Sequence, residues 1–417
     1  MSKETIVSLA ERVKRASRTL INLSTTEKTN VLISMASALR DNMTYLQEEN
    51  RKDLAGAQKN NLSTAMIDRL TLSDGVVEGM ARALEEIAEL PDPVGKITGM
   101  VKRPNGLMVG RMRIPIGVIG IIYESRPNVT ADAAGLCLKS GNAVILRGGS
   151  EAFNSNKAIV QVLQRSLELS GIDRDVVGFI PVTDRQAVLD MLTLEEYIDL
   201  IIPRGGESLI RTVVENSMIP VLKHYKGVCH IFVDKDADLD KAYDICLNAK
   251  AQRPGVCNAM ETLLVDSAIA EAFLPEMIRI FSDNGVEIRG CDKTRSIVPD
   301  VKQAKEDDWY EEFLDLILAV KITDNMYEAI DHIEKYGSNH TEAIITENYT
   351  RAMEFLRLVD SSTVLVNAST RFSDGGEFGL GAEVGISTSK IHAYGPMGIE
   401  DLTIQKFICF GDGQIRK

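Results

Sequence analysis

Short, almost continuously apolar segments alternate with helical stretches through the middle of the chain, and this alternation constrains the fold most. The apolar runs lie at 114–123, 143–146, 176–180 and 200–203, and helical patterns at 129–140 and 156–170 separate the first of them. Strands that are apolar on both faces are typical of parallel sheets covered by crossover helices. The sequence therefore predicts an α/β fold with a parallel sheet and right-handed crossovers.

The alternation begins late and is repeated later in the chain. Apolar residues from Ile6 to Leu20 recur every three to four positions, and Ser24 with Glu27 forms a capping-box pattern, so the first ninety residues are predicted to be helical. A second α/β region opens at 230–233, with its clearest strands at 261–265 and 317–320. The segment 100–113 predicts a turn and an extended strand. Residues 402–410 predict an amphipathic edge strand that pairs with another subunit.

Composition excludes several classes of protein. The 417 residues suffice for two or three domains of roughly 150 residues. A net charge of −13 without a Lys/Arg run argues against nucleic-acid binding, and the longest apolar run falls short of the roughly 18 residues of a membrane span. No apolar signal segment opens the chain, so we expect a cytoplasmic protein. The scattered cysteines and histidines predict neither disulfides nor a metal site.

Two glycine loops follow predicted strands and resemble phosphate cradles. One runs from Arg147 through two glycines to Ser150, and the other contains Gly205 and Gly206 and opens a helix. Glycines allow a ligand to approach the backbone, and a helix N-terminus offers free N–H groups to an anion. Each loop alone is also typical of a tight turn. Two such loops at the carboxyl ends of parallel strands favour a dinucleotide site.

Cys257 is the candidate nucleophile. It follows Pro254 and Gly255 in a loop between a helical segment and an apolar run, and Arg253 is close enough to favour its thiolate. A buried structural thiol is the common alternative for a cysteine. A second polar loop contains Ser369, Thr370 and Arg371, which suit a carboxylate or a phosphate, although a solvated surface loop has the same composition.

With these motifs the chain resembles the aldehyde dehydrogenase superfamily and, more closely, its γ-glutamyl phosphate reductase family. The resemblance covers essentially the whole length, and its most specific segments are 121–130, 252–258, 329–342, 366–372 and 378–383. It implies NADPH-dependent reduction of L-glutamyl 5-phosphate to L-glutamate 5-semialdehyde and phosphate, through a thioester on Cys257, in L-proline biosynthesis.

The resemblance also implies the domain organisation. It implies a Rossmann-type NADPH-binding domain at 1–98 and 114–226 and an α/β catalytic domain at 227–395, with 363–395 packing at the domain boundary. A small β oligomerisation flap comprises 99–113 and 396–417. The implied partners are an acyl phosphate substrate, further copies of the chain and, transiently, the glutamate kinase, with no nucleic acid or membrane.

The same resemblance distributes the remaining roles. Gly205 and Gly206 are implied to contact the cofactor pyrophosphate, and Glu312 the nicotinamide ribose. Asn128 is the candidate oxyanion donor beside the backbone N–H of Cys257. Arg126 and Arg253 are candidates for aiding the departure of phosphate, and the amino-acid end of the substrate is assigned to Ser369, Thr370 and Arg371.

Two departures from the wider superfamily predict the chemistry. Oxidising members carry a glutamate that activates water against the thioester, whereas the corresponding segment here, 222–227, has no carboxylate. Members that use NAD often bind the ribose through a glutamate, but here Ser150 follows Arg147, which favours the 2′-phosphate of NADPH, although Glu151 would repel it. The alternatives are a hydrolytic NAD(P)-dependent semialdehyde dehydrogenase and a non-catalytic scaffold subunit.

Overall fold

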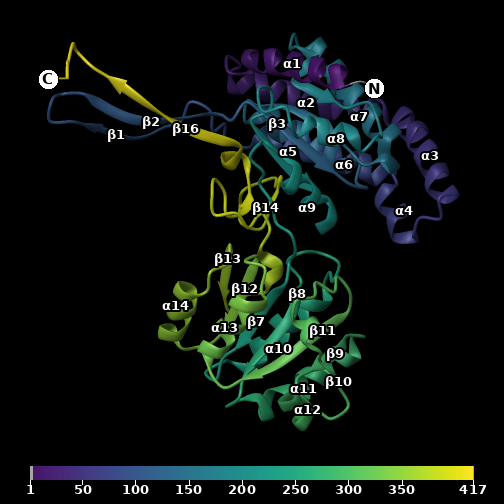
Figure 1. Cartoon of the computed structure of the whole chain (residues 1–417), viewed down its shortest axis with the longest axis vertical. Helices are drawn as coiled ribbons and strands as arrows, with labels where there is room; N and C mark the ends of the chain where they lie inside the picture. The colour runs from purple at the N-terminus through teal and green to yellow at the C-terminus, as the bar shows by residue number, and fades with distance from the viewer. Residues whose placement is uncertain (1–2, 417) are drawn as a thin grey trace. The chain divides into compact units, whose positions relative to one another are not determined.

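The computed structural model describes residues 3–416, and the chain forms two compact units (Figure 1). The first unit holds the chain up to residue 223 together with 380–385 and the segment from 397 onward, and the second holds 224–379 and 386–396. Among the described residues no helix combines the length and the apolar character that crossing a membrane requires.

The first unit begins with the predicted helices. These are α1 (Lys3–Leu20), α2 (Thr25–Asp41), α3 (Met43–Lys59), α4 (Thr64–Leu70) and α5 (Asp74–Glu89). The capping box at α2 is confirmed, because the Ser24 hydroxyl accepts from the backbone N–H of Glu27 and the Glu27 carboxylate accepts the backbone N–H of Ser24 at 2.7 Å. The apolar face of α1 is buried, as its periodicity predicts.

A four-stranded parallel sheet forms the core of the first unit, in the order β5-β4-β3-β6. Its elements are β3 (Val118–Tyr123), α6 (Asn128–Lys139), β4 (Ala143–Arg147), α7 (Phe153–Leu169), β5 (Val177–Phe179), α8 (Gln186–Met191), β6 (Leu200–Arg204) and α9 (Glu207–Asn216). All residues of β3 and β4 are buried, which confirms the prediction from their continuous apolar sequence.

The single strand predicted over 114–123 is wrong in its first part. Pro115 ends β2 (Met108–Pro115), which belongs to a different sheet, and β3 starts only at Val118. Between them Gly117 has φ 136°, and a Cβ there would collide with the carboxylate of Asp199, which accepts the backbone N–H of Val118 at 2.8 Å. The turn lies inside an uninterrupted apolar run, so hydrophobicity gives no sign of it.

A three-stranded antiparallel ribbon completes the first unit. It pairs β1 (Ile97–Lys102), β2 and β16 (Thr403–Phe410) in that order, and Figure 1 shows it extending away from the helices of its unit. The predicted terminal strand is thus an edge strand, and it exposes Phe407 and Phe410. Its pairing with another subunit stays a prediction.

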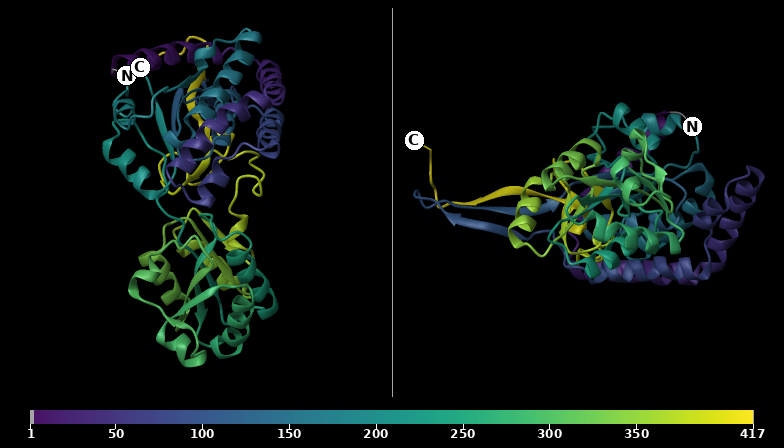
Figure 2. Two further views of the ribbon diagram at one scale, coloured as in Figure 1. Left: turned by 90° about the vertical axis from the view of Figure 1, so that its right-hand side faces the viewer. Right: turned by 90° about the horizontal axis from the view of Figure 1, so that it is seen from below.

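The second unit is built around a sheet with helices packed about it (Figure 2). The sheet has seven strands in the order β10-β9-β11-β8-β7-β12-β13, and all its strand pairs are parallel. Its elements are β7 (Cys229–Val233), α10 (Leu239–Ala251), β8 (Met260–Asp266), α11 (Ala270–Asp283), β9 (Glu287–Gly290), α12 (Asp292–Ile297), β10 (Lys302–Gln303), β11 (Ile317–Thr323), α13 (Met326–Tyr336), β12 (Thr341–Ile345), α14 (Tyr349–Leu358) and β13 (Thr363–Val366). The strands predicted at 230–233, 261–265 and 317–320 fall in β7, β8 and β11.

Candidate functional site

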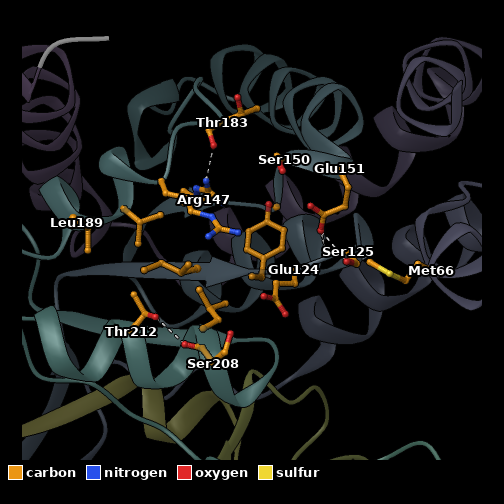
Figure 3. Close-up of a pocket in the computed structure, with 16 residues that line it drawn as sticks. Met66, Glu124, Ser125, Arg147, Ser150, Glu151, Thr183, Leu189, Ser208 and Thr212 are labelled. Atoms are coloured by element: carbon orange, nitrogen blue, oxygen red, sulfur yellow. Dashed lines mark hydrogen bonds between the residues drawn. The ribbon is translucent and has the colours of Figure 1, made fainter. Parts of the chain in front are cut away.

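The loops that follow the four parallel strands of the first unit line a cavity of about 510 Å³ (Figure 3). The residues that line it include Glu124 after β3, Arg147 and Ser150 after β4, Arg185 after β5 and Ser208 in α9. The cavity therefore lies at the carboxyl edge of the sheet, where open α/β folds bind their ligands.

Arg147 is the central cation of this cavity. Its guanidinium donates to the carbonyl oxygens of Gly148 at 2.9 Å and Thr183 at 3.1 Å, while its buried Nε has no hydrogen-bond partner. Desolvation and the nearby charge of Arg185 lower the pKa of Arg147. An anion bound beside these two cations would stabilise the charged form of Arg147. Arg185 was not among the residues predicted from the sequence, although its place after a parallel strand was an available signal.

The acidic residues of the cavity are held by backbone N–H groups. Glu124 accepts the N–H of Gly206 at 2.9 Å, and Glu151 accepts the N–H of Ser125 at 2.7 Å and its hydroxyl at 2.8 Å (Figure 3). A Cβ on Gly205 would lie 2.5 Å from the Glu124 carboxylate and 2.8 Å from Leu209, so a larger residue would have to displace these side chains. The N–H of Gly206 is thus engaged by the Glu124 side chain, and the Glu151 carboxylate is engaged by Ser125. The contact of Gly205 and Gly206 with a pyrophosphate stays a prediction.

Cys257 lies half-buried in the second unit, in the loop that connects α10 to β8. The thiol of Cys229 donates to the carbonyl oxygen of Cys257 at 3.1 Å. The side-chain amide of Asn258 donates to the backbone carbonyl oxygen of Ser373 at 2.9 Å. A Cβ on Gly227 would collide with the Cys257 carbonyl group. The cysteine backbone is therefore held between the entry to β7 and the loop that follows β13.

Two imidazoles lie beside the thiol. One possible ligand atom from each of His224, Cys257 and His340 lies within 4.8 Å of the others, and the two rings meet edge-on with centroids 5.7 Å apart. Burial lowers the pKa of His340 to about 3, so that imidazole is neutral. His224 was not predicted as a site residue. It lies in the segment 222–227, which the sequence singled out only because it lacks the glutamate of oxidising members.

Two guanidinium groups accompany the cysteine loop. Arg371 donates to the side chain of Gln252 at 2.8 Å. Desolvation and the charge of Arg253 lower the pKa of Arg371, whereas the charge of Cys257 raises it, so Arg371 interacts with both of these residues. Of the predicted residues of the second unit, Arg371 thus lies close enough to Arg253 and Cys257 to interact with their charges. Within the 369–371 loop, Ser369 accepts the backbone N–H of Arg371 at 3.3 Å.

The cysteine loop is closed at its base by a buried ion pair. Lys250, in the last turn of α10, donates to Glu261 in β8 at 2.5 Å, and neither side chain is exposed. Desolvation raises the pKa of Glu261 to about 7, and the charge of Glu312 acts in the same direction. The backbone N–H of Leu314 also donates to Glu261, at 3.2 Å. Glu312 therefore belongs to the unit of Cys257.

Two further predicted residues lie in the first unit. Arg126 is exposed in the turn before α6, and Asn128 opens that helix with its amide donating to Asp132 at 3.2 Å. The buried hydroxyl of Thr370, in the second unit, has no hydrogen-bond partner. The roles predicted for Asn128 in oxyanion binding and for Thr370 in substrate binding stay predictions.

Known proteins match this architecture over the full chain. The sequence model of the aldehyde dehydrogenase family matches residues 1–286. The γ-glutamyl phosphate reductases of Thermodesulfovibrio yellowstonii and Geobacter metallireducens are each 58% identical, and the aligned regions cover 100% and 99% of this chain and 99% of each relative. The crystal structure of γ-glutamyl phosphate reductase from Thermotoga maritima superposes with a TM-score of 0.97 at 48% identity, covering 99% of this chain and 100% of that one.

Aldehyde dehydrogenases use NAD(P) as cofactor. The glycine loops, the unpartnered Arg147 Nε and the neighbouring Arg185 fit such a dinucleotide. Fold, cysteine loop and full-length similarity agree, and the chain belongs to the aldehyde dehydrogenase family, in its branch of γ-glutamyl phosphate reductases.

Proposed function

We propose that this chain reduces L-glutamyl 5-phosphate to L-glutamate 5-semialdehyde and phosphate, with NADPH as the reductant, in L-proline biosynthesis. The observation that carries the proposal is a half-buried cysteine, Cys257, four residues after Arg253 in one loop, with Arg371 interacting electrostatically with both residues. A substrate with a phosphate at one end and a carboxylate at the other matches such a pair of guanidinium groups. The names of the full-length relatives support the same reaction.

In this mechanism Cys257 acts as a nucleophile. Its sulfur attacks the acyl carbon, a C–S bond forms, and the C–O bond to phosphate breaks with its electron pair leaving on phosphate. Arg253 favours the thiolate and stabilises the developing charge on the departing phosphate. Bound NADPH supplies the hydride that turns the thioester carbon into an aldehyde and returns the sulfur to its thiolate form.

The choice of NADPH follows from the charges of the cavity. Arg147 and Arg185 present two cations, and Ser150 stands where a carboxylate would repel a 2′-phosphate. Glu151, which could have supplied that repulsion, is engaged by Ser125. The proposed 2′-phosphate site is therefore the end of the cavity that holds Arg147 and Arg185.

The segment 222–227 favours reduction over hydrolysis. It brings the imidazole of His224, and no carboxylate of its own, to the cysteine cluster. Without a glutamate from this segment to activate water, the thioester persists until hydride transfer in the proposed direction or attack by phosphate in reverse.

Phosphate dependence of the reverse reaction tests this function. The enzyme is given glutamate 5-semialdehyde and NADP⁺, with and without inorganic phosphate, and the formation of NADPH is recorded. We expect NADPH only when phosphate is present. Equal rates without phosphate would establish the hydrolytic dehydrogenase, and no turnover under either condition would favour a scaffold subunit.

We further propose that the enzyme works in the cytoplasm as a homo-oligomer. Six free cysteines, including the nucleophile, suit a reducing compartment. The exposed edge of β16, with Phe407 and Phe410 outward, is the proposed pairing surface. Sedimentation of the Phe407→Lys variant tests it, because a weaker assembly is expected. A transient contact with the glutamate kinase would shorten the path of a labile acyl phosphate.

A further inference from the structure

Three side chains that the sequence separates widely come together in the second unit. His224 precedes β7, Cys257 precedes β8 and His340 precedes β12, and these are three adjacent strands of one parallel sheet. One nitrogen or sulfur ligand atom from each residue lies within 4.8 Å of the other two.

Hydrogen bonds orient the His224 ring. Its Nδ1 lies 3.0 Å from the backbone carbonyl oxygen of Ile386. A carbonyl oxygen only accepts, so Nδ1 carries the hydrogen and Nε2 carries the lone pair. Metal-binding histidines use this arrangement, in which a backbone carbonyl fixes the tautomer and orients the ring.

A chain of buried hydroxyls does the same for His340. The Thr341 hydroxyl donates to Ser373 at 2.9 Å, and the Ser373 hydroxyl donates to Thr363 at 3.2 Å. Thr341 therefore accepts from Nδ1 of His340, at 2.8 Å, which leaves the lone pair on Nε2. That Nε2 is completely buried and has no hydrogen-bond partner, a costly state for a polar atom. The Nε2 lone pair can therefore accept a hydrogen bond or bind a cation.

We propose that Cys257, His224 and His340 form a zinc site that reversibly blocks the nucleophile. A thiolate and two imidazoles are the ligands that Zn²⁺ prefers, and water would complete the tetrahedron. Ligand atoms of such a site lie roughly 3.3–3.8 Å apart, so these three must approach by at most about 1–1.5 Å. On binding, Cys257 loses its thiol proton to solvent, an S–Zn bond forms, and no electron is transferred.

The site takes its ligands from one unit and needs no substrate or cofactor. A chain that binds no zinc could therefore still catalyse the proposed reduction, and a chain that does not catalyse the reduction could still bind zinc. The proposal is tested on metal-free, full-length protein with ZnCl₂ as the probe. Calorimetry measures stoichiometry and affinity, and Co²⁺ reports thiolate ligation through its charge-transfer and tetrahedral d–d absorption. Alkylation by iodoacetamide, followed by mass spectrometry, measures access to Cys257, with exposed Cys409 as the internal reference.

We expect one zinc per chain, a cobalt spectrum with thiolate charge transfer that zinc abolishes, and protection of Cys257 but not of Cys409. Cys257→Ser, His340→Gln and His224→Gln should each weaken zinc binding by at least about tenfold. The exposed control His392→Gln should leave it unchanged. His340 is buried, so circular dichroism must confirm its fold, and the half-buried His224 supplies the variant that does not depend on the core.

Several results would overturn the proposal. Zinc affinity equal in wild type and Cys257→Ser would place the ion elsewhere. Unchanged affinity in a folded His224→Gln protein would reduce the site to a simple thiol adduct. Full alkylation of Cys257 at saturating zinc would show that the nucleophile is not a ligand.

Discussion

The two parallel sheets of the molecule carry their sites at opposite edges. In the first unit the cavity lies where β3, β4, β5 and β6 end, whereas in the second unit the cysteine cluster lies where β7, β8 and β12 begin. The two sites also hold their charges differently. The cavity's charged groups are bound by backbone carbonyl and N–H groups, whereas Lys250 and Glu261 clamp the cysteine loop as a buried ion pair.

This difference matches two tasks. Hydrogen bonds to neutral backbone groups exchange for ligand contacts at little net cost, which suits a cofactor that must bind and leave. A buried ion pair is costly to open, which suits an atom that must stay in one place during chemistry. We therefore expect substitutions in the cavity to change affinity, and substitutions around the cysteine to change rate or stability.

The largest effect is expected from removing the nucleophile, which should abolish turnover but leave cofactor binding in the first unit intact. Cys257→Ala should lower turnover by roughly 10⁴-fold or more, because a removed nucleophile leaves no covalent route. NADPH affinity, followed by the change in cofactor fluorescence, should stay within a factor of two. Substantial remaining activity would end the covalent mechanism. The exposed control is Cys409→Ser.

The clamp of the cysteine loop gives the next effect. Lys250→Met should lower the free energy of unfolding by about 3–5 kcal/mol, since Glu261 would stay buried without its partner. Fluorescence of Trp309, the single tryptophan of the sequence, reports urea unfolding of the second unit.

Two controls define the origin of that loss. The double variant Lys250→Met with Glu261→Leu should recover most of the stability, because no lone charge remains buried. Lys390→Met removes a pair with Asp360 whose side chains are more than 60% exposed, and it should leave the free energy of unfolding nearly unchanged. Equal losses of unfolding free energy in Lys250→Met and Lys390→Met would show that the buried ion pair contributes no more to stability than an exposed one.

A smaller effect is expected in the cavity. Arg147→Ala should weaken NADPH binding by roughly 10–100-fold, the value of one or two charge-assisted hydrogen bonds, and leave NADH binding nearly unchanged. Arg185→Ala should act in the same direction but less, because its side chain is exposed. Equal weakening for both dinucleotides would place Arg147 at a part of the cofactor that they share.

The smallest effect concerns the carboxylate at the start of α9. Glu124→Gln should tighten NADPH binding by roughly two- to fivefold, since a charge that competes for the helix N-terminus is removed. Glu215→Gln, the same change near the other end of α9, should not tighten it. Weaker binding in Glu124→Gln would instead make Glu124 a contact of the cofactor.

Local pattern predicts much of this molecule. Strand identity, the parallel sheets, the capping box of α2 and the placement of Cys257 between a helix and a buried strand all follow from periodicity and turn residues. The break at 116–117 does not, because a turn inside an apolar run leaves the run unchanged. The domain boundaries at 98, 113, 226 and 395 stay predictions.

Contacts that depend on the order of strands in a sheet could not be predicted from the sequence. His224, Cys257 and His340 meet only because β7 lies between β8 and β12, an order that no local pattern contains. Arg185 was accessible in principle, since the rule that ligands bind at carboxyl edges applies to every strand of the sheet. The same rule gives no guide to the second site, which lies at an amino edge.

Gly227 restricts the substitutions that the sequence can tolerate during evolution. Alanine there differs by one methyl group, yet that group would strike the carbonyl of Cys257. A single-codon substitution at a position that takes no part in the chemistry would thus displace the reacting atom. The approach to β7 and the cysteine loop cannot drift independently, so mutational routes that rebuild 222–227 must keep residue 227 without a side chain.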